Sequence, residues 1–144
     1  MLLAQFATAL AAIPLLMPGP SAVEIAQNTD PYANWIYLYQ DVFQNSAGQE
    51  VTQQWWLEPD VQRSNLLNFT LLARRSPVSD NGTAAAVFDY VADCEAMSYS
   101  IERTEFLDGN NTTLDVQTSQ KVMESANPES QFYTVLNDIC NGIY

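Results

Sequence analysis

The feature that most constrains this chain is an amphipathic helix predicted near its C-terminus, which carries one of only two cysteines. The helix is predicted over Asn127 to Gly142, because apolar side chains recur there at the three- and four-residue spacing that places them on one stripe. The stripe consists of Phe132, Val135, Leu136, Ile139, Cys140 and Ile143. The other cysteine, Cys94, ends an apolar β-like run. A bond between Cys94 and Cys140 would join this helix to a sheet.

Both ends of the predicted helix carry recognisable signals. Asn127 is a favourable N-cap, and Pro128 follows at the first helical position, where its missing N–H costs nothing. Glu129 suits the positive end of the helix dipole, and Gly142 can adopt the left-handed conformation that ends a helix. These signals predict that the helix begins directly after Asn127.

Two stretches in the first half of the chain are predicted to form a β-hairpin. Asn34 to Phe43 and Gln49 to Leu57 are rich in aromatic and β-branched residues, and the turn residues Asn45 to Gly48 separate them. Both alternating faces of the first stretch are apolar. We therefore expect this strand to be covered on both sides or to lie centrally in the sheet.

The later strands are predicted from alternation. Leu66 to Arg75 and Thr83 to Cys94 each place apolar side chains on one face. These are Leu67, Phe69, Leu71 and Ala73 in the first strand, and Phe88, Tyr90, Ala92 and Cys94 in the second. The helix stripe is expected to dock on this face. Beyond Cys94 the apolar positions change phase, which predicts a bulge near Glu95.

The remaining chain before the helix is predicted to hold one more hairpin. Asp108 to Asn111 form a strong turn signal, and Thr112 to Gln117 form the short return strand. Ser119 to Ala126 are expected to link that strand to the helix. The predicted fold class is therefore α+β, with an antiparallel sheet of about five or six strands packed against a C-terminal helix and held to it by one disulfide.

The N-terminal stretch indicates export. Met1 to Met17 carry no charge, and helix breakers and small residues follow. This pattern predicts a signal peptide within 1–26, a linker over 27–33 and a single α+β domain over 34–144. The alternative is an uncleaved membrane anchor, because the uncharged length approaches the roughly 20 residues that span a bilayer. Export would place the protein in the periplasm, at the cell surface or outside the cell, where two cysteines usually pair.

Charge and composition exclude several classes of function. With 17 acidic and 5 basic residues, the net charge of −12 leaves no basic stripe for nucleic acid and opposes docking on anionic lipid. A membrane contact is therefore expected only through the N-terminal segment, if it is uncleaved. The chain has no histidine, which excludes Ser-His-Asp, Cys-His and HExxH chemistry. Two cysteines without a CxxC spacing also argue against a structural zinc site.

The chain resembles a known family of exported domains. The residues that carry the resemblance are a tryptophan-containing first strand, the pair Asp93-Cys94, the run Tyr99 to Asn110, and Asp138-Ile139-Cys140 in the terminal helix. This combination, between Trp35 and Cys140, is similar to the surface-adhesin protein E family of small bacterial exported domains. The resemblance implies an antiparallel sheet joined to the C-terminal helix by Cys94 and Cys140, and a binding module instead of an enzyme. No segment of this chain carries over the adhesive role residue by residue.

Two neighbouring tryptophans are the candidate binding residues. Trp55 and Trp56 face opposite sides of their strand, so one of them is expected to look away from the core. An exposed tryptophan is a common anchor for a partner protein or a sugar ring, although a second layer or the linker could cover it. Asp89, Asp93 and Glu95 could form a calcium-binding acidic face, but a solvated outer face is the expected arrangement.

The sequence thus predicts a non-catalytic, adhesin-like exported domain that binds a protein or a surface polymer, without catalytic, cofactor-binding or metal-ligating residues. The alternative is an accessory or structural subunit of a larger extracytoplasmic or membrane-associated assembly. A third interpretation is a small hydrolase that uses paired carboxylates.

Overall fold

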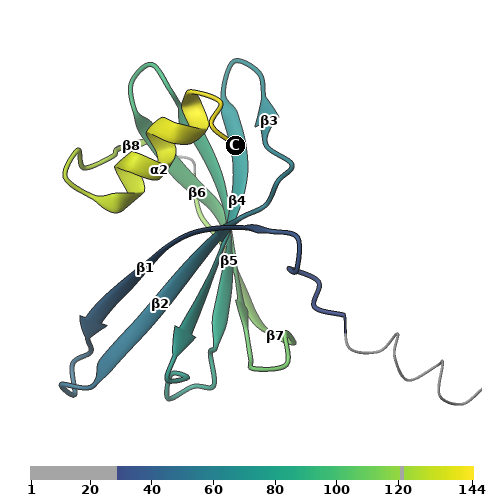
Figure 1. Ribbon diagram of the computed structural model, residues 1–144, viewed down its shortest axis with the longest axis vertical. Coiled ribbons are helices and arrows are strands. Elements are labelled where there is room, and N and C mark those ends of the chain that lie inside the picture. Colours follow the sequence, from purple (N-terminus) through teal and green to yellow (C-terminus); the bar gives the residue numbers. More distant parts are fainter. Residues whose placement is uncertain (1–28, 121) are drawn as a thin grey trace, which may run out of the picture. The chain divides into compact units, whose positions relative to one another are not determined.

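In the computed structural model, which describes residues 29–120 and 122–144, an antiparallel sheet precedes a C-terminal helix (Figure 1). The elements are β1 Ile36–Gln44, β2 Glu50–Leu57, β3 Gln62–Arg63, β4 Leu67–Ser76, β5 Ala85–Asp93, β6 Ser98–Leu107, β7 Thr113–Thr118, β8 Glu124–Ser125 and α2 Gln131–Cys140. Six main strands neighbour one another in the order β1-β2-β4-β5-β6-β7, and every pair is antiparallel. The predicted fold class is confirmed. The predictions for 1–26 lie outside the described residues.

Two very short strands extend the sheet at the end that α2 covers. β3 pairs with the first residues of β4, and β8 pairs with the first residues of β6. Each has only two residues, which is too short for a periodic pattern to indicate. The predicted link from Ser119 to Ala126 therefore contains a strand that the sequence analysis missed.

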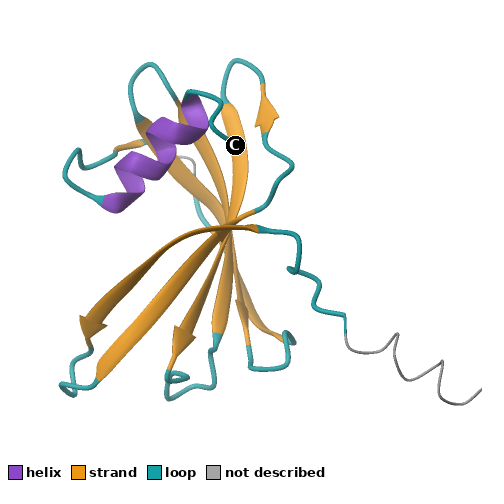
Figure 2. Ribbon diagram, viewed as in Figure 1, coloured by secondary structure: helices purple, strands orange, loops and turns teal. Residues whose placement is uncertain are grey.

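The hydrophobic core lies between α2 and one face of the sheet, which we call the inner face (Figure 2). Its buried members are Leu57, Leu67, Phe69, Leu71, Tyr90 and Ala92 from the sheet, Val135, Leu136 and Ile139 from α2, and Ala126 before the helix. Phe132 of α2 stacks on Tyr90 of β5 with ring centroids 5.2 Å apart. The helix therefore docks where the alternation of β4 and β5 predicts.

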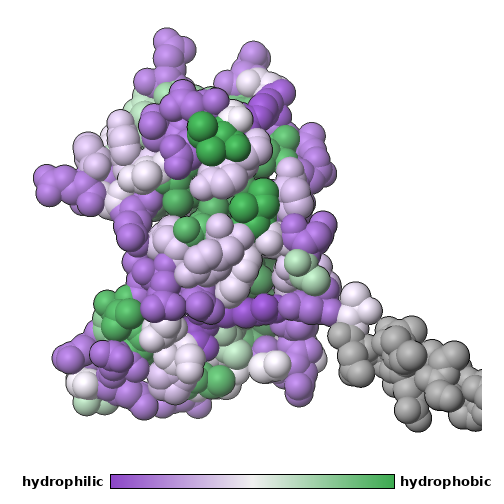
Figure 3. Space-filling model, in the orientation of Figure 1, coloured by the Kyte–Doolittle hydropathy of each residue, from purple (hydrophilic) through white to green (hydrophobic). Residues whose placement is uncertain are grey.

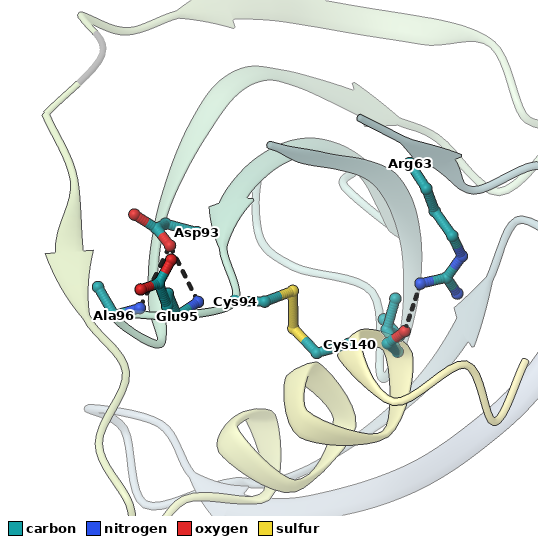
Figure 4. The surroundings of a disulfide bond; sticks show 7 residues. Arg63, Asp93, Cys94, Glu95, Ala96 and Cys140 are labelled. Atoms are coloured by element: carbon teal, nitrogen blue, oxygen red, sulfur yellow. Dashed lines mark hydrogen bonds between the residues drawn. A yellow bond between two sulfur atoms is a disulfide. The ribbon is translucent and has the colours of Figure 1, made fainter. Parts of the chain in front are cut away.

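A disulfide joins Cys94 to Cys140, with the two Cα atoms 5.7 Å apart, as predicted. Figure 4 shows that it connects the turn after β5 to the last residue of α2. Cys94 itself is exposed in that turn, so the expectation that it faces the core at the end of the strand is wrong. Beside the bond, Arg63 Nη1 donates to the Ile139 carbonyl at 2.7 Å and so satisfies one of the helix's terminal acceptors.

The predicted start of the helix is three residues too early. Ser130 is the N-cap, and its Oγ accepts the Tyr133 N–H at 3.1 Å. Asn127 instead closes a turn before the helix: its Oδ1 accepts the Glu129 N–H, and its carbonyl accepts the Ser130 N–H, both at 3.0 Å. Pro128 therefore lies in this turn. Asn127 and Ser130 are both of the residue types that cap helices well, and the one nearer the apolar stripe caps this helix.

The helix ends as predicted. Gly142 has a φ of 74°, which is the left-handed conformation. The N–H of Gly142 donates to the Ile139 carbonyl, and the N–H of Ile143 donates to the Asp138 carbonyl, which together form a Schellman motif. Ile143 follows this stop and is 66% exposed, so it does not continue the buried stripe.

The first strand is an edge strand, which contradicts the prediction that it is central or covered on both sides. Tyr37 pairs with Trp56 and Tyr39 pairs with Trp55, so Leu38 is an extra residue that bulges between them. A bulge swaps the alternation. The residues before and after Leu38 therefore alternate in opposite phase. Apolar residues thus occupy both odd and even positions of the sequence, although the strand lies at the edge of the sheet.

The phase change after Cys94 also has a different origin from the one predicted. A four-residue turn, 94–97, joins β5 to β6. Because the turn has an even number of residues, even-numbered residues of β5 pair with odd-numbered residues of β6, and the change of phase needs no bulge. The irregularity in this pair lies farther along, where Asp89 pairs with Arg103 and Tyr90 pairs with Ile101. Glu102 is thus the extra residue, and the predicted bulge near Glu95 is wrong.

Candidate functional site

Trp55 belongs to an aromatic row on the inner face. Its ring lies between those of Tyr39 and Phe88, at centroid distances of 6.0 and 5.7 Å, with both pairs stacked. Phe88 is on β5, two strands away, and the small Ala73 on the intervening β4 leaves room for Trp55 to reach it. Within the described residues, the buried indole Nε1 of Trp55 has no hydrogen-bond partner. Trp55 is thus largely a packing residue of the inner face.

Trp56 lies on the opposite face of β2, which we call the outer face. Tyr37 meets it edge-on with ring centroids 5.5 Å apart, and the guanidinium carbon of Arg74 lies 5.5 Å from its centroid. We call Tyr37, Trp56 and Arg74 the outer aromatic cluster. Tyr37 is 49% exposed, whereas Trp56 is half-buried. Trp56 is therefore the tryptophan that looks away from α2, and its role in binding stays a prediction.

The three carboxylates singled out in the sequence do not converge. Asp89 accepts a hydrogen bond from Thr70 Oγ1 at 3.1 Å. Asp93 Oδ1 accepts the N–H groups of Glu95 and Ala96, at 3.0 and 3.2 Å, and so closes the turn that carries Cys94 (Figure 4). Among the described residues, no group of three or more acidic or cysteine side chains could hold a metal ion. Asp93 thus has a structural part in positioning the disulfide.

A second group of carboxylates lies around a cavity of about 290 Å³ that sequence reasoning missed. Its acidic members come from separate segments of the chain and are Glu58, Asp60, Asp89 and Glu102. Burial, and then the charges of Asp60 and Asp89, raise the pKa of Glu58 above its usual value. No local motif unites these residues, because Glu58 and Asp60 follow β2 whereas Asp89 and Glu102 lie in the middle of β5 and β6.

A larger polar cleft of about 550 Å³ lies at the end of the sheet opposite α2. The β1–β2 turn, the β4–β5 loop and the strands β6 and β7 contribute its walls. Its lining residues are Asn45, Ser46, Gln49, Arg75, Val78, Ser79, Asp80, Asn81, Thr83, Phe106, Leu114, Asp115 and Gln117. Residues of turns and loops make up more than half of this lining, and of these only Asn45 and Ser46 were singled out in the sequence, as turn residues.

The chain was compared with known proteins at three levels. No family model, curated sequence or solved structure matches it. The similarity to the surface-adhesin protein E family therefore stays a hypothesis. Among the described residues, no helix is long and apolar enough to cross a membrane.

Proposed function

We propose that this protein is a non-catalytic exported domain that binds a partner protein or a surface polymer through the outer aromatic cluster. The observation that carries the proposal is the position of Trp56, with Tyr37 at its edge and Arg74 over its ring, on the sheet face away from α2. Aromatic and arginine side chains are the residue types most enriched among those that dominate binding energy. The partner is expected to present an apolar or sugar-ring surface to this cluster.

The surroundings of the cluster support a docking role. Val42, on the same outer face of β1, is 55% exposed. On the same face, Gln54 Nε2 donates to Gln40 Oε1 at 3.2 Å. Aromatic residues and arginine are enriched at protein interfaces relative to the rest of the surface, which supports a docking role for this face.

The disulfide and the N-terminal sequence support export to the periplasm, the cell surface or the extracellular space. Cytosolic thiols are kept reduced, whereas an exported domain of this size gains stability from a crosslink. The resemblance to the surface-adhesin protein E family, whose members are exported domains, also supports export.

The experiment that tests this proposal is cell binding by the purified, oxidised full chain, measured as protein that sediments with washed cells of the source organism. Trp56→Ala is expected to lose most of the bound protein, because truncation of a central aromatic anchor costs about 2 kcal/mol or more. Leu66→Ala is the matched control, since Leu66 is another exposed apolar residue (41%) that is not part of the outer aromatic cluster. Equal binding by the Trp56 variant and the wild type would rule out the outer aromatic cluster as the docking surface.

The second candidate is an accessory or structural subunit of a larger assembly. It is favoured by apolar side chains on the two marginal strands: Phe43 on β1 is 42% exposed, and Leu114 and Val116 on β7 are 46% and 42% exposed. Open edges with apolar side chains tend to pair with other chains. A subunit would elute with its complex from a sizing column and aggregate alone, whereas a binding module would elute as a soluble monomer or dimer.

A further inference from the structure

The polar cleft opposite α2 is a second place where this chain could hold a ligand, and it shares no residue with the outer aromatic cluster. Its volume of about 550 Å³ falls within the usual range for small-molecule sites, which is about 300–1,000 Å³. Segments distant in sequence form it: the β1–β2 turn, the β4–β5 loop and β7 all meet at this end of the sheet (Figure 1).

The walls of the cleft are held by internal hydrogen bonds. Asn45 Oδ1 accepts the N–H groups of Ala47 and Gln49, at 3.0 and 2.9 Å, and fixes the β1–β2 turn. On the opposite wall, Asn81 Oδ1 accepts the Thr83 N–H at 3.1 Å and fixes the β4–β5 loop. A binding site that is ordered before the ligand arrives loses less entropy on binding.

The polar groups of the cleft include both donors and acceptors. Arg75 Nε donates to the Pro77 carbonyl at 3.0 Å, and its Nη groups make no hydrogen bond to the described residues. Asp115 and Gln117 extend from β7, and Asp80 lies in the β4–β5 loop. Carboxylates accept, the guanidinium donates, and the amides do both. A ligand that fits must therefore offer several groups that can donate and accept at once.

Apolar surface accompanies these polar groups. Phe106 of β6 points to the inner face and is half-buried, while Val78 and Leu114 are 51% and 46% exposed. Sugar rings combine hydroxyl groups, which both donate and accept, with a flat patch of C–H bonds that packs on an aromatic ring. The mixture in this cleft matches that combination.

The charged residues of the cleft favour a neutral sugar over a polar ligand that carries a net charge. Asp80 and Asp115, together with the net charge of −12, oppose a phosphate or another anion. The Arg75 guanidinium offsets part of this negative charge, so the cleft is not an all-carboxylate cation site. We propose that this cleft binds a segment of a neutral oligosaccharide, with Phe106 beneath one ring and with Arg75, Asp115 and Gln117 on its hydroxyl groups.

The test is a nuclear magnetic resonance titration of the full-length, oxidised protein with four neutral trisaccharides: maltotriose, cellotriose, chitotriose and mannotriose. At least one is expected to shift the side-chain amide signals of Asn45, Asn81 and Gln117 saturably, with a Kd of about 1 mM or tighter. The absence of a saturable shift with all four sugars would overturn the proposal.

Variants then locate the site. Gln117→Ala changes an exposed residue, so it is expected to fold normally and to weaken binding by about fivefold to tenfold. Phe106→Leu keeps an apolar side chain but removes the ring, and it is expected to weaken binding at least as much. Leu66→Ala, at an exposed residue outside both the cleft and the outer aromatic cluster, is the control and is expected to bind the sugar as the wild type does. If Trp56→Ala abolishes sugar binding while Gln117→Ala does not, the sugar site is the outer aromatic cluster and the cleft assignment fails.

Charged probes complete the test. Trilysine and sialyllactose present a cation and an anion of comparable size. At physiological salt, which screens the net charge of −12, both are expected to bind more weakly at the cleft than the best neutral sugar, because the cleft contains groups of both signs. Tighter binding of either probe at the same amide signals would show that the cleft recognises charge and would overturn the proposal.

Discussion

Tyr39 shows how one extra residue changes the environment of a side chain. The bulge at Leu38 turns Tyr39 to the inner face, where it stacks on Trp55. Burial, and secondarily the charge of Asp41, raise the pKa of Tyr39 to about 12. Burial raises the pKa of Tyr90 in the core as well. The folded protein therefore keeps both phenolic protons at a pH where the unfolded chain releases them.

This difference predicts that the free energy of unfolding falls in alkaline solution. Below pH 10, the ordinary pKa of tyrosine, both states are protonated and the stability is fully present. As the pH rises from 10 to about 12, the unfolded state binds fewer protons than the folded state, so stability is lost. Urea unfolding across this range, with phenolate absorbance recorded in parallel, measures the effect.

The matched variant is Tyr39→Phe, which removes one titrating group and keeps the ring. It is expected to reduce the alkaline loss of stability and to leave the part that is due to Tyr90. An alkaline slope identical to that of the wild type would contradict the burial-induced shift at Tyr39.

Single residues also explain where sequence reasoning succeeded and failed at this scale. Gly142 was predicted correctly, because its φ of 74° is a conformation that few other residues adopt readily. Asn127 was wrongly chosen as the N-cap, because Asn and Ser are almost equally good caps and both precede the apolar stripe. The choice of Ser130 depends on the turn that Asn127 forms, which is set by three-dimensional packing.

At the scale of elements, α2 is attached to the sheet by three kinds of interaction. Its apolar stripe packs on the inner face, Arg63 of β3 bonds the Ile139 carbonyl, and Cys140 is joined to Cys94. The helix has only ten residues, which is marginal for a helix on its own. Its stability therefore depends mainly on these attachments.

Removal of the disulfide should reveal how much it contributes. The bond joins residues 46 positions apart, and the chain-entropy model gives about 4 kcal/mol for a loop of that length. The double variant Cys94→Ser/Cys140→Ser is expected to lose roughly that much free energy of unfolding in urea. The reduced wild type is the control, and it should resemble the double variant. A loss below about 1 kcal/mol would mean that packing alone holds α2 in place.

For strands with clear periodicity, the side chains that face the core were predicted correctly, but the position of a strand within the sheet was not. The faces of β4 and β5 follow from alternation, because Phe69 and Tyr90 have to reach the core. The edge position of β1 could not be found this way, since its bulge puts apolar residues on both faces of the pattern. Strand order is a property of pairing between segments distant in sequence, and alternation alone carries no information about it.

At the scale of the whole molecule, charge is the dominant feature. Hydrophilic residues predominate on the face drawn in Figure 3, and apolar ones form small separate patches. Seventeen acidic residues face only five basic ones. Arg63 and Arg75 donate to backbone carbonyls, and Arg103 pairs with Glu105 at 3.2 Å. Few positive charges are therefore placed to offset the acidic surface.

This imbalance predicts that salt stabilises the fold at neutral pH. Self-repulsion in a chain of net charge −12 favours the expanded state, and added ions screen it. Raising sodium chloride from low to physiological concentration is expected to increase Tm by about 4 °C, which corresponds to about 1 kcal/mol. Near the isoelectric point of about 4.1 the same addition should have little effect. A salt effect of equal size at both pH values would exclude self-repulsion as its cause.

The candidate sites also differ in how much of each could be predicted from the sequence. Trp55 and Trp56 could be assigned to opposite faces, because adjacent positions in a strand always are. The polar cleft could not be found, since Asn45, Asn81 and Gln117 lie in three separate segments without a shared motif. The three segments come together only in the folded sheet, at the end opposite α2.

The crosslink between the β5–β6 turn and the end of α2 makes residues 94–140 a covalent ring that contains β6, β7, β8 and α2. Where proteases are present, a single backbone cut anywhere within that ring leaves both pieces tethered through sulfur. The nicked molecule would keep its sheet order, and it would separate into fragments only in a reducing environment.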